Sequence, residues 1–178
     1  MALPNDLGAI RQFDAKSLEK YVDMFEFMAY DLNWNSTIAR GHTDFRDIED
    51  IAFPLWTSGV SMSKVNLGLA YYGRGFTLDD PSCAHENCNA TPHVKDGPCT
   101  KSGREGILSL NEIKNIVKER GFSPKPIPKA RYKEIAWDGQ WIGYDDEETL
   151  MMKRTWASSR CFGGTMIWSM DYYNHGKI

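Results

Sequence analysis

The most informative stretch of the sequence is FMAYDL, residues 27–32, in which a short apolar run ends on a tyrosine and an aspartate. A strand can end on such a pair because it has reached water. It can also end there because a hydroxyl and a carboxylate are needed to hydrogen-bond a substrate at that end of the strand. Two other apolar runs, VNLGLAYYGRGF and GGTMIWSMD, also close on aromatic and charged residues, so the same question arises at three places.

The three runs read as buried strands, at residues 24–31, 65–72 and 164–170. The second run shows no polar alternation before Tyr72, which is typical of a parallel strand covered on both faces. Parallel strands separated by helices make an α/β fold, and in a β/α barrel the active site lies at the carboxyl ends of the strands. The residues that close the three runs are therefore expected at the edge of the sheet where a barrel holds its substrate.

Alternation along a strand indicates which of these side chains share a face. It groups Met28 with Tyr30, and it groups Gly68 and Ala70 with Tyr72 and Arg74 on one continuous strand. Small residues deep in the strand and large polar ones at its tip suit a barrel mouth that admits a ligand.

A further carboxylate, Glu26, shares the face of Tyr30. At ~3.3 Å per residue it lies about 13 Å deeper along the strand. We therefore interpret Glu26 as a buried structural carboxylate rather than as an acid of the site.

The segments between the runs carry helix and turn signals. Apolar spacing and helix-terminal residues predict helices at 17–25, near 46–52, from 110 to 120 and at 147–162. Ser109 and Glu112 form a capping box for the third helix, and Gly121 ends it. Asp138-Gly139, between two strand-like segments, predicts a two-residue hairpin turn. Only three or four barrel strands are counted in this way, whereas a complete eight-stranded barrel needs about 200 residues or more.

Composition excludes several classes of function. The 178 residues include 21 basic and 24 acidic side chains, for a net charge of −3, and there is no basic run. Binding to nucleic acid or to an anionic membrane surface would need such a patch, so neither partner is expected. No apolar stretch approaches the roughly 18 residues of a membrane helix. The opening MALPNDLGAI lacks the basic start and apolar core of a signal peptide.

Three of the four cysteines lie within one polar stretch, at Cys83, Cys88 and Cys99. A stretch rich in Gly, Pro, Asn and Asp has little hydrophobic core of its own, so we expect disulfide bonds to stabilise it. Disulfides in turn imply an oxidising compartment. Zinc is the alternative because His85 and His93 are close by, but no second tight cysteine pair follows. With Cys161, four cysteines allow three connectivities, and the sequence does not choose among them.

In this order, the motifs resemble glycoside hydrolase family 18, and within it the fungal chitinases of the killer-toxin-subunit type. FMAYDL resembles the M-x-Y-D at the end of barrel strand six, and VNLGLAYYGRGFTL resembles strand seven with its Y-G-R-x-F. GGTMIWSMDY resembles strand eight with its tryptophan, and the opening ALPNDLGAI resembles strand five. The cysteine-bearing stretch and WIGYDDEETLMMK resemble the insertion that follows strand seven.

The resemblance implies an α/β fold that is the C-terminal part of a (β/α)8 TIM barrel, strands five to eight. Residues 1–77 would carry strands five to seven, and residues 147–178 would carry the last helix and strand eight. Residues 78–146 would form an α+β insertion domain between strand seven and the last helices.

The resemblance also implies a function for the site. Family members hydrolyse β-1,4 N-acetylglucosamine linkages with retention, using the acetamide oxygen of the substrate as nucleophile. Two positions would be catalytic, Tyr30 and Asp31, and four would bind substrate, namely Met28, Tyr72, Arg74 and Trp168. Tyr30 would hydrogen-bond the N-acetyl group, Asp31 would orient it, and Trp168 would form the flat floor beneath the sugar. The partner would be chitin or a chito-oligosaccharide, and no cofactor or metal is implied.

One part of the family pattern is missing. The acid of the family is the last residue of D-x-x-D-x-D-x-E on strand four, and the 178 residues contain no such motif. The continuation after Asp31, Leu32-Asn33-Trp34, also differs from the His-Gly that many members have. We expect the chain to be the C-terminal part of a longer secreted chitinase and to be inactive on chitin by itself. The alternatives are a chitin-binding, lectin-like protein without the acid, and a killer-toxin-like subunit that attaches to chitin.

Overall fold

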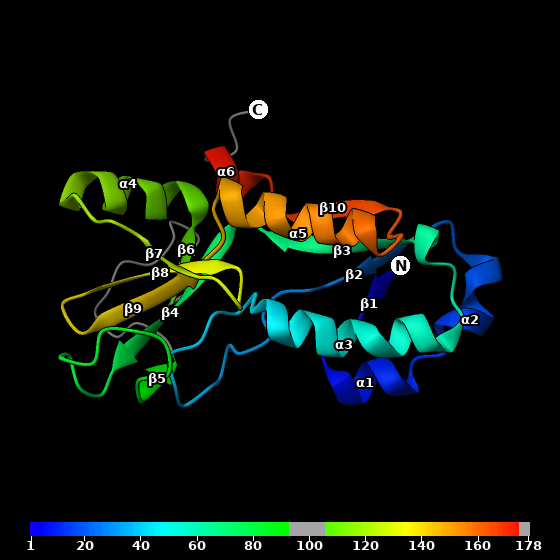
Figure 1. Cartoon of the computed structure of the whole chain (residues 1–178), viewed down its shortest axis with the longest axis horizontal. Helices are drawn as coiled ribbons and strands as arrows, with labels where there is room; N and C mark the ends of the chain where they lie inside the picture. The colour runs from blue at the N-terminus through cyan, green and yellow to red at the C-terminus, as the bar shows by residue number, and fades with distance from the viewer. Residues whose placement is uncertain (93–105, 175–178) are drawn as a thin grey trace.

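The computed structural model describes residues 1–92 and 106–174, and in this part of the chain the strands form two sheets (Figure 1). The first sheet is parallel, in the order β1-β2-β3-β10. Its strands are β1 (Ala2–Leu3), β2 (Phe25–Phe27), β3 (Val65–Ala70) and β10 (Gly164–Trp168). All four therefore end at the same edge, and β3 pairs with β10 from Asn66↔Gly164 to Ala70↔Trp168.

Helices flank this sheet and alternate with its strands along the chain, as the α/β rhythm requires. They are α1 (Leu7–Gln12), α2 (Ala15–Leu18), a 3₁₀ turn at Glu19–Tyr21, α3 (Phe45–Ser58), α5 (Glu147–Ser159) and α6 (Asp171–Asn174), with a second 3₁₀ turn at Met62–Lys64 before β3. No helix of the described ranges is both long enough and apolar enough to cross a membrane.

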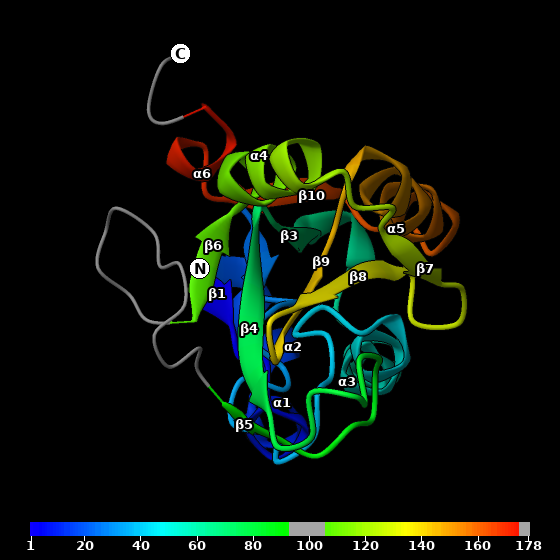
Figure 2. The same ribbon diagram turned by 90° about the vertical axis from the view of Figure 1, so that its left-hand side faces the viewer.

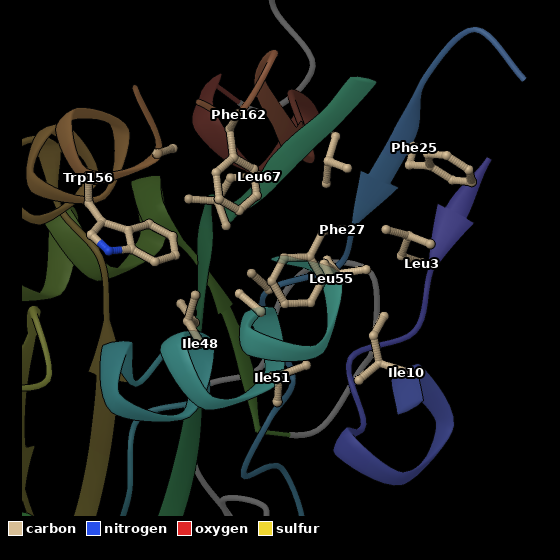
Figure 3. Packing of buried hydrophobic residues seen from close by; sticks show 14 of the residues in the cluster. Leu3, Ile10, Phe25, Phe27, Ile48, Ile51, Leu55, Leu67, Trp156 and Phe162 are labelled. Atoms are coloured by element: carbon tan, nitrogen blue, oxygen red, sulfur yellow. The ribbon is translucent and has the colours of Figure 1, made fainter. Parts of the chain in front are cut away.

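The core of this part lies between the parallel sheet, α3 and α5 (Figure 3). Phe25 and Phe27 of β2 are fully buried, because they share the face of the strand that belongs to this core. Ile48 and Leu55 reach the sheet from α3, and Trp156 reaches it from α5. The apolar stripe of α3 and the apolar face of β2 thus bury each other.

The second sheet is separate from the first, and all its strands pair antiparallel (Figure 2). It is built around β4, in the order β5-β4-β9-β8-β7, and β6 also pairs with β4. Its elements are β4 (Tyr72–Leu78), β5 (Ala90–Pro92), β6 (Ile107–Ser109), α4 (Leu110–Arg120), β7 (Lys125–Ile127), β8 (Tyr132–Trp137) and β9 (Gln140–Tyr144). The predicted domain boundary at residue 77 lies within β4. The whole of β4 belongs to this second sheet, because it pairs only with strands of that sheet.

The prediction of one continuous strand through Ala70, Tyr72 and Arg74 is wrong. β3 ends at Ala70, and the chain passes through Tyr71 into β4, where Arg74 pairs with Gly143 of β9. Tyr71 joins the sheets, since its N–H donates to the carbonyl oxygen of Trp168 at 2.8 Å and its carbonyl accepts from the Leu110 N–H at 2.8 Å. An apolar run looks the same whether it pairs with one sheet or with two, so the sequence did not reveal the break.

The predicted helix at 17–25 is also wrong in its extent. The helical segment ends at Tyr21, whose side chain is 75% exposed, and Phe25 already belongs to β2. The helix expected near 46–52 is longer than predicted and runs from Phe45 to Ser58. Asp44 caps its first turn through the Arg46 N–H, and Gly59 ends it at a φ of +76°.

Two local predictions are confirmed. Ser109 and Glu112 form the capping box of α4, and Gly121 ends the helix in the left-handed region at a φ of +65°. The hairpin between β8 and β9 turns at Asp138-Gly139, with φ values of +48° and +73°. Both depend on residues a few positions apart, so local chemistry decides them.

The carboxylate that we interpreted as structural, Glu26, lies on β2 beside β3. The amide nitrogen of Asn66 donates to its Oε1 at 3.1 Å. Its Oε2 is buried and has no hydrogen-bond partner among residues 1–92 and 106–174. Glu26 is thus only half satisfied within the parallel sheet.

Cys83 and Cys88 are joined by a disulfide, Cys161 is a free exposed cysteine, and Cys99 and His93 lie outside the described residues. His85 lies beside the disulfide, with its Nε2 3.8 Å from the sulfur of Cys83. The ring nitrogen and the two sulfurs form a group of potential metal ligands within 4.8 Å of one another, although both sulfurs are used by the bond.

Replacing Cys83 and Cys88 together by serine is expected to lower the free energy of unfolding by about 2 kcal/mol, because the bond closes only a short loop. The two cysteines are 5 positions apart. Urea unfolding of the double variant measures the loss, with Cys161→Ser as the control that leaves stability unchanged. Equal stability of the double variant and the parent would contradict the expectation.

Candidate functional site

The candidate site is centred on the carboxylate of Asp31, which follows β2. The hydroxyl of Tyr72 donates to its Oδ1 at 2.5 Å. The guanidinium of Arg74 donates to both oxygens, from Nε to Oδ1 at 2.6 Å and from Nη2 to Oδ2 at 2.8 Å. A two-pronged arginine–carboxylate pair fixes both the position and the plane of the carboxylate. The parallel sheet thus supplies the acid, and the second sheet supplies its two partners.

These partners set the charge of Asp31. Burial alone would raise the pKa of the carboxyl, but hydrogen bonds from Arg74 and Tyr72 favour the anion and hold the pKa well below its ordinary value. The pKa of the Tyr72 hydroxyl is raised, by burial first and then by the negative charge of Asp31. Asp31 is therefore a permanent anion near neutral pH that accepts hydrogen bonds and does not donate a proton.

Tyr30 lies beside Asp31 with its ring buried against Tyr72, the ring centroids 6.2 Å apart in an edge-to-face arrangement. Burial and the charges of Asp31 and Glu26 raise the pKa of its hydroxyl to about 12, so the hydroxyl keeps its proton and is a hydrogen-bond donor. Within the described residues, the hydroxyl donates to no other side chain. The amide of Asn5 holds the backbone of Tyr30 by donating to its carbonyl oxygen at 2.7 Å.

Gly68 of β3 provides the space for the Tyr30 ring. A Cβ at this position would lie 2.5 Å from the carbonyl oxygen of Phe27 and 2.9 Å from Cε1 of Tyr30. Neither atom has room to move, because one is backbone and the other belongs to a buried ring. The close approach of β2 and β3 below the site therefore requires glycine here.

Replacing Gly68 by alanine is expected to lower the free energy of unfolding by about 1–3 kcal/mol and to displace the Tyr30 ring, because the added methyl group overpacks this contact. The control is Gly8→Ala on the exposed side of α1, where alanine favours the helix and the added Cβ meets only the end of the exposed Asp6 side chain, at 3.1 Å. Urea unfolding of the two variants measures the difference, and a Gly68→Ala variant as stable as Gly8→Ala would rule out the packing argument.

The two remaining predicted residues differ in how closely they contact this centre. Met28 packs against the cluster of Tyr30 and Tyr72, as do Met166 and Tyr172, which the sequence did not predict. Trp168 ends β10 at the same edge of the sheet, and its side chain is 51% exposed. A large aromatic ring held at a strand end and left half open to solvent offers a flat apolar surface to a ligand.

Sequence reasoning also missed His42. Its ring is fully buried, stacks on Tyr72 with centroids 4.6 Å apart, and contacts Asp31. No motif marked it, because it stands in a polar segment eleven residues after Asp31. Its neighbour Gly41 gives the only local signal, since a Cβ there would lie 2.5 Å from the Tyr132 ring, so the chain must pass closely here.

The family of the chain follows from a comparison of its sequence with known families. The model of glycosyl hydrolases family 18 matches residues 1–172, which contain every element of the site. The chain belongs to glycosyl hydrolases family 18.

Curated relatives agree with this family. The chain is 27% identical over 184 residues to chitotriosidase-1 of Mus musculus, covering 96% of this chain and 38% of the relative. It is 28% identical over 173 residues to an endochitinase of Brugia malayi, covering 90% of this chain and 34% of the relative. The killer toxin subunits alpha/beta of Kluyveromyces lactis are 25% identical over 195 residues, covering 99% of this chain and 16% of the relative. The chain thus spans well under half of each of these relatives.

Solved structures show the likeness of the fold. The group IV chitinase of Ostrinia furnacalis, in complex with allosamidin, matches with a TM-score of 0.88 at 23% identity, over 99% of this chain and 51% of that chain. The class V chitinase of Nicotiana tobaccum in complex with NAG4 matches with a TM-score of 0.82 at 21% identity, over 96% and 51%. The described fold therefore corresponds to about half of each of these two chains.

Proposed function

We propose that this chain carries the part of a family 18 chitinase site that binds the N-acetyl group of a chito-oligosaccharide. The observation that supports this most strongly is a hydroxyl donor next to a fixed anion, at consecutive positions just after β2. Tyr30 offers a hydroxyl donor without a protein acceptor among the described residues, next to the fixed anion Asp31. An acetamide presents a carbonyl acceptor and an N–H donor, which match a hydroxyl and a carboxylate respectively.

The other groups complete this binding surface. Trp168 would lie beneath the apolar face of the sugar ring, and Met28 would line the wall. Tyr72 and Arg74 orient Asp31, and Arg74 keeps donors available for a neighbouring sugar. We assign β1, β2, β3 and β10 to barrel strands five to eight, and the second sheet with α4 to the insertion. The parallel order of the four strands and their common edge support this assignment.

Hydrolysis needs an acid that this site does not provide. In the substrate-assisted retaining mechanism, the acetamide oxygen attacks while a carboxylic acid protonates the leaving oxygen. Asp31 is unsuited to be this acid, because its depressed pKa keeps it ionised. The 178 residues contain no D-x-x-D-x-D-x-E. We therefore propose that the chain by itself binds chito-oligosaccharides without cleaving them.

Two further assignments are part of the proposal. The Cys83–Cys88 disulfide supports an extracellular or other oxidising location, because such bonds persist there. The match to a killer toxin over nearly the whole chain supports a relation to fungal chitinases of that type.

Calorimetric titration of the chain with chitotetraose and with cellotetraose tests the proposal. The two sugars share the β-1,4 backbone, and only the first has acetamido groups. We expect binding of chitotetraose alone, with no shorter sugar released on long incubation. Equal binding of the two sugars, or binding of neither, would refute the acetamide site, and release of shorter sugars would refute the proposed lack of hydrolysis.

A further inference from the structure

The residue that carries a further inference is His42, which lies between β2 and β4 without belonging to either. The ring is fully buried, and both of its nitrogens contact groups of the site. Nδ1 is 3.2 Å from the backbone nitrogen of Asp31, and Nε2 is 3.0 Å from the carbonyl oxygen of Tyr72. The histidine thus bridges the carboxylate-bearing segment and the first residue of β4.

These contacts determine which nitrogen carries the proton. A carbonyl oxygen only accepts hydrogen bonds, so Nε2 must be protonated to bond Tyr72. A backbone N–H only donates, so Nδ1 must be unprotonated to accept from Asp31. The Oδ1 of Asp31 is also near Nδ1, at 3.4 Å, but it already accepts from Tyr72 and Arg74 at 2.5 and 2.6 Å. The N–H is the closer group, and the geometry favours the neutral ring.

We propose that His42 is a positioning residue: a neutral imidazole, protonated at Nε2, that holds the Asp31 carboxylate, and the Tyr72 hydroxyl that donates to it, in place at the sugar site. Asp31 has a φ of +59°, a left-handed conformation that is unfavourable for a residue with a side chain. The hydrogen bond from its N–H to Nδ1 stabilises this conformation, which turns the carboxylate toward Arg74. The bond from Nε2 fixes the start of β4 and with it the Tyr72 ring.

The loop that bears His42 is anchored by a buried ion pair. Lys153 of α5 is 1% exposed and donates to the carbonyl oxygen of Thr43 at 2.7 Å, while its charge is balanced by Asp145, with contacts of 2.7 and 2.6 Å. On the other side, the N–H of Leu32 donates to the carbonyl oxygen of His42 at 3.0 Å. The backbone around His42 is therefore held on one side by α5 and on the other by the segment that follows Asp31. These contacts fix the position of the ring.

Nitrogen NMR of the uniformly ¹⁵N-labelled 178-residue chain at pH 7 tests the proposed ring state directly. We expect the His42 signals of a neutral ring protonated at Nε2. Signals of an imidazolium, or of a ring protonated at Nδ1, would overturn the proposal. This measurement needs no ligand, so it can fail or succeed whatever the outcome of the chitotetraose titration on which the proposed function depends.

Two matched variants separate the roles of the two nitrogens. In His42→Asn the side-chain oxygen can take the place of Nδ1, and in His42→Gln the side-chain NH₂ can take the place of Nε2. We expect the amide signal of Asp31 to stay near its parent position in the asparagine variant and to move in the glutamine variant, and that of Tyr72 to do the reverse. Folded variants in which both signals move together, or neither moves, would indicate a merely structural histidine.

The positioning role also predicts a functional loss, and this part rests on the proposed function. His42→Ala removes both bonds and is expected to raise the Kd for chitotetraose at least about tenfold, which corresponds to ~1.4 kcal/mol. His42→Asn should retain more of the affinity, because it keeps the acceptor for Asp31. If the parent chain binds chitotetraose and a folded His42→Ala variant binds it equally well, the positioning role is refuted while the proposed function stands.

Discussion

Replacing Asp31 by asparagine is expected to abolish detectable binding of chitotetraose and to lower the free energy of unfolding by about 1.5–3 kcal/mol, the range for hydrogen bonds to charged groups. The amide keeps the size of the carboxylate but offers one acceptor atom in place of two. Arg74 donates to both oxygens of Asp31, and its side chain is only 17% exposed. One of its donors would face the amide NH₂, and its charge would lose its partner in a site that water reaches poorly.

The same variant predicts a pH dependence with a definite sign. The pKa of Asp31 in the folded chain lies well below its ordinary value, whereas an unfolded aspartate titrates at about 3.9. Below this pH the unfolded state takes up a proton that the folded state still refuses, so the contribution of Asp31 to stability is present above about pH 4 and is lost as the pH falls. Urea unfolding should therefore show a smaller difference between parent and Asp31→Asn at pH 3 than at pH 7.

The matched control for this variant is Asp138→Asn. Asp138 also pairs with an arginine, Arg120, but the two side chains are 72% and 48% exposed, and such pairs contribute at most about 1 kcal/mol. Asparagine is also well suited to its position in the β8–β9 turn. The account would be contradicted if the two variants lost equal stability, or if the loss for Asp31→Asn grew on going from pH 7 to pH 3.

Replacing Trp168 by alanine is expected to raise the Kd for chitotetraose roughly thirtyfold, equivalent to ~2 kcal/mol, and to lower the unfolding free energy by only about 1 kcal/mol, for the half of the ring that is already buried. The ring is 51% exposed in the free chain, so much of its apolar area remains to be buried against a sugar. Its backbone is held independently, because its carbonyl oxygen accepts from the Tyr71 N–H at 2.8 Å. Calorimetry and urea unfolding measure the two quantities separately.

Tyr21→Ala is the control for this prediction. The Tyr21 ring is 75% exposed, but it precedes β2, whereas the site follows that strand. Its removal should leave the Kd unchanged. A Trp168→Ala variant that binds chitotetraose as tightly as Tyr21→Ala would show that the tryptophan is not the floor of the site.

The parts of the fold that the sequence predicted depend on residues close together in the chain. The capping box of Ser109 and Glu112 and the turn at Asp138-Gly139 are decided by interactions across a few residues. The buried strands around Phe25 and Val65 could be predicted because their apolar runs are longer than those of a strand with one face exposed to water. Their exact ends could not, since β2 ends at Phe27 although its neighbour β3 continues from the paired Leu67 to Ala70.

The parts that could not be predicted depend on partners far along the chain. The break at Tyr71 arises because Arg74 pairs with Gly143, almost seventy residues later. In the same way, His42 joins the site only because α5 holds its loop through Lys153, 110 residues away from Thr43. A motif read along the sequence gave Asp31 and Arg74 as separate contacts to a ligand, whereas the structure brings them together as one ion pair.

The central claim is that the sugar binds at the edge formed by Tyr30, Asp31 and Trp168. Titration of the ¹⁵N-labelled chain with chitotetraose, followed by two-dimensional NMR, tests it most directly. We expect the backbone signals of these residues and the indole signal of Trp168 to shift together with one saturation curve, while those of the exposed outer face of α5 stay in place. Shifts confined to other surfaces, or no shifts at millimolar sugar, would contradict the account.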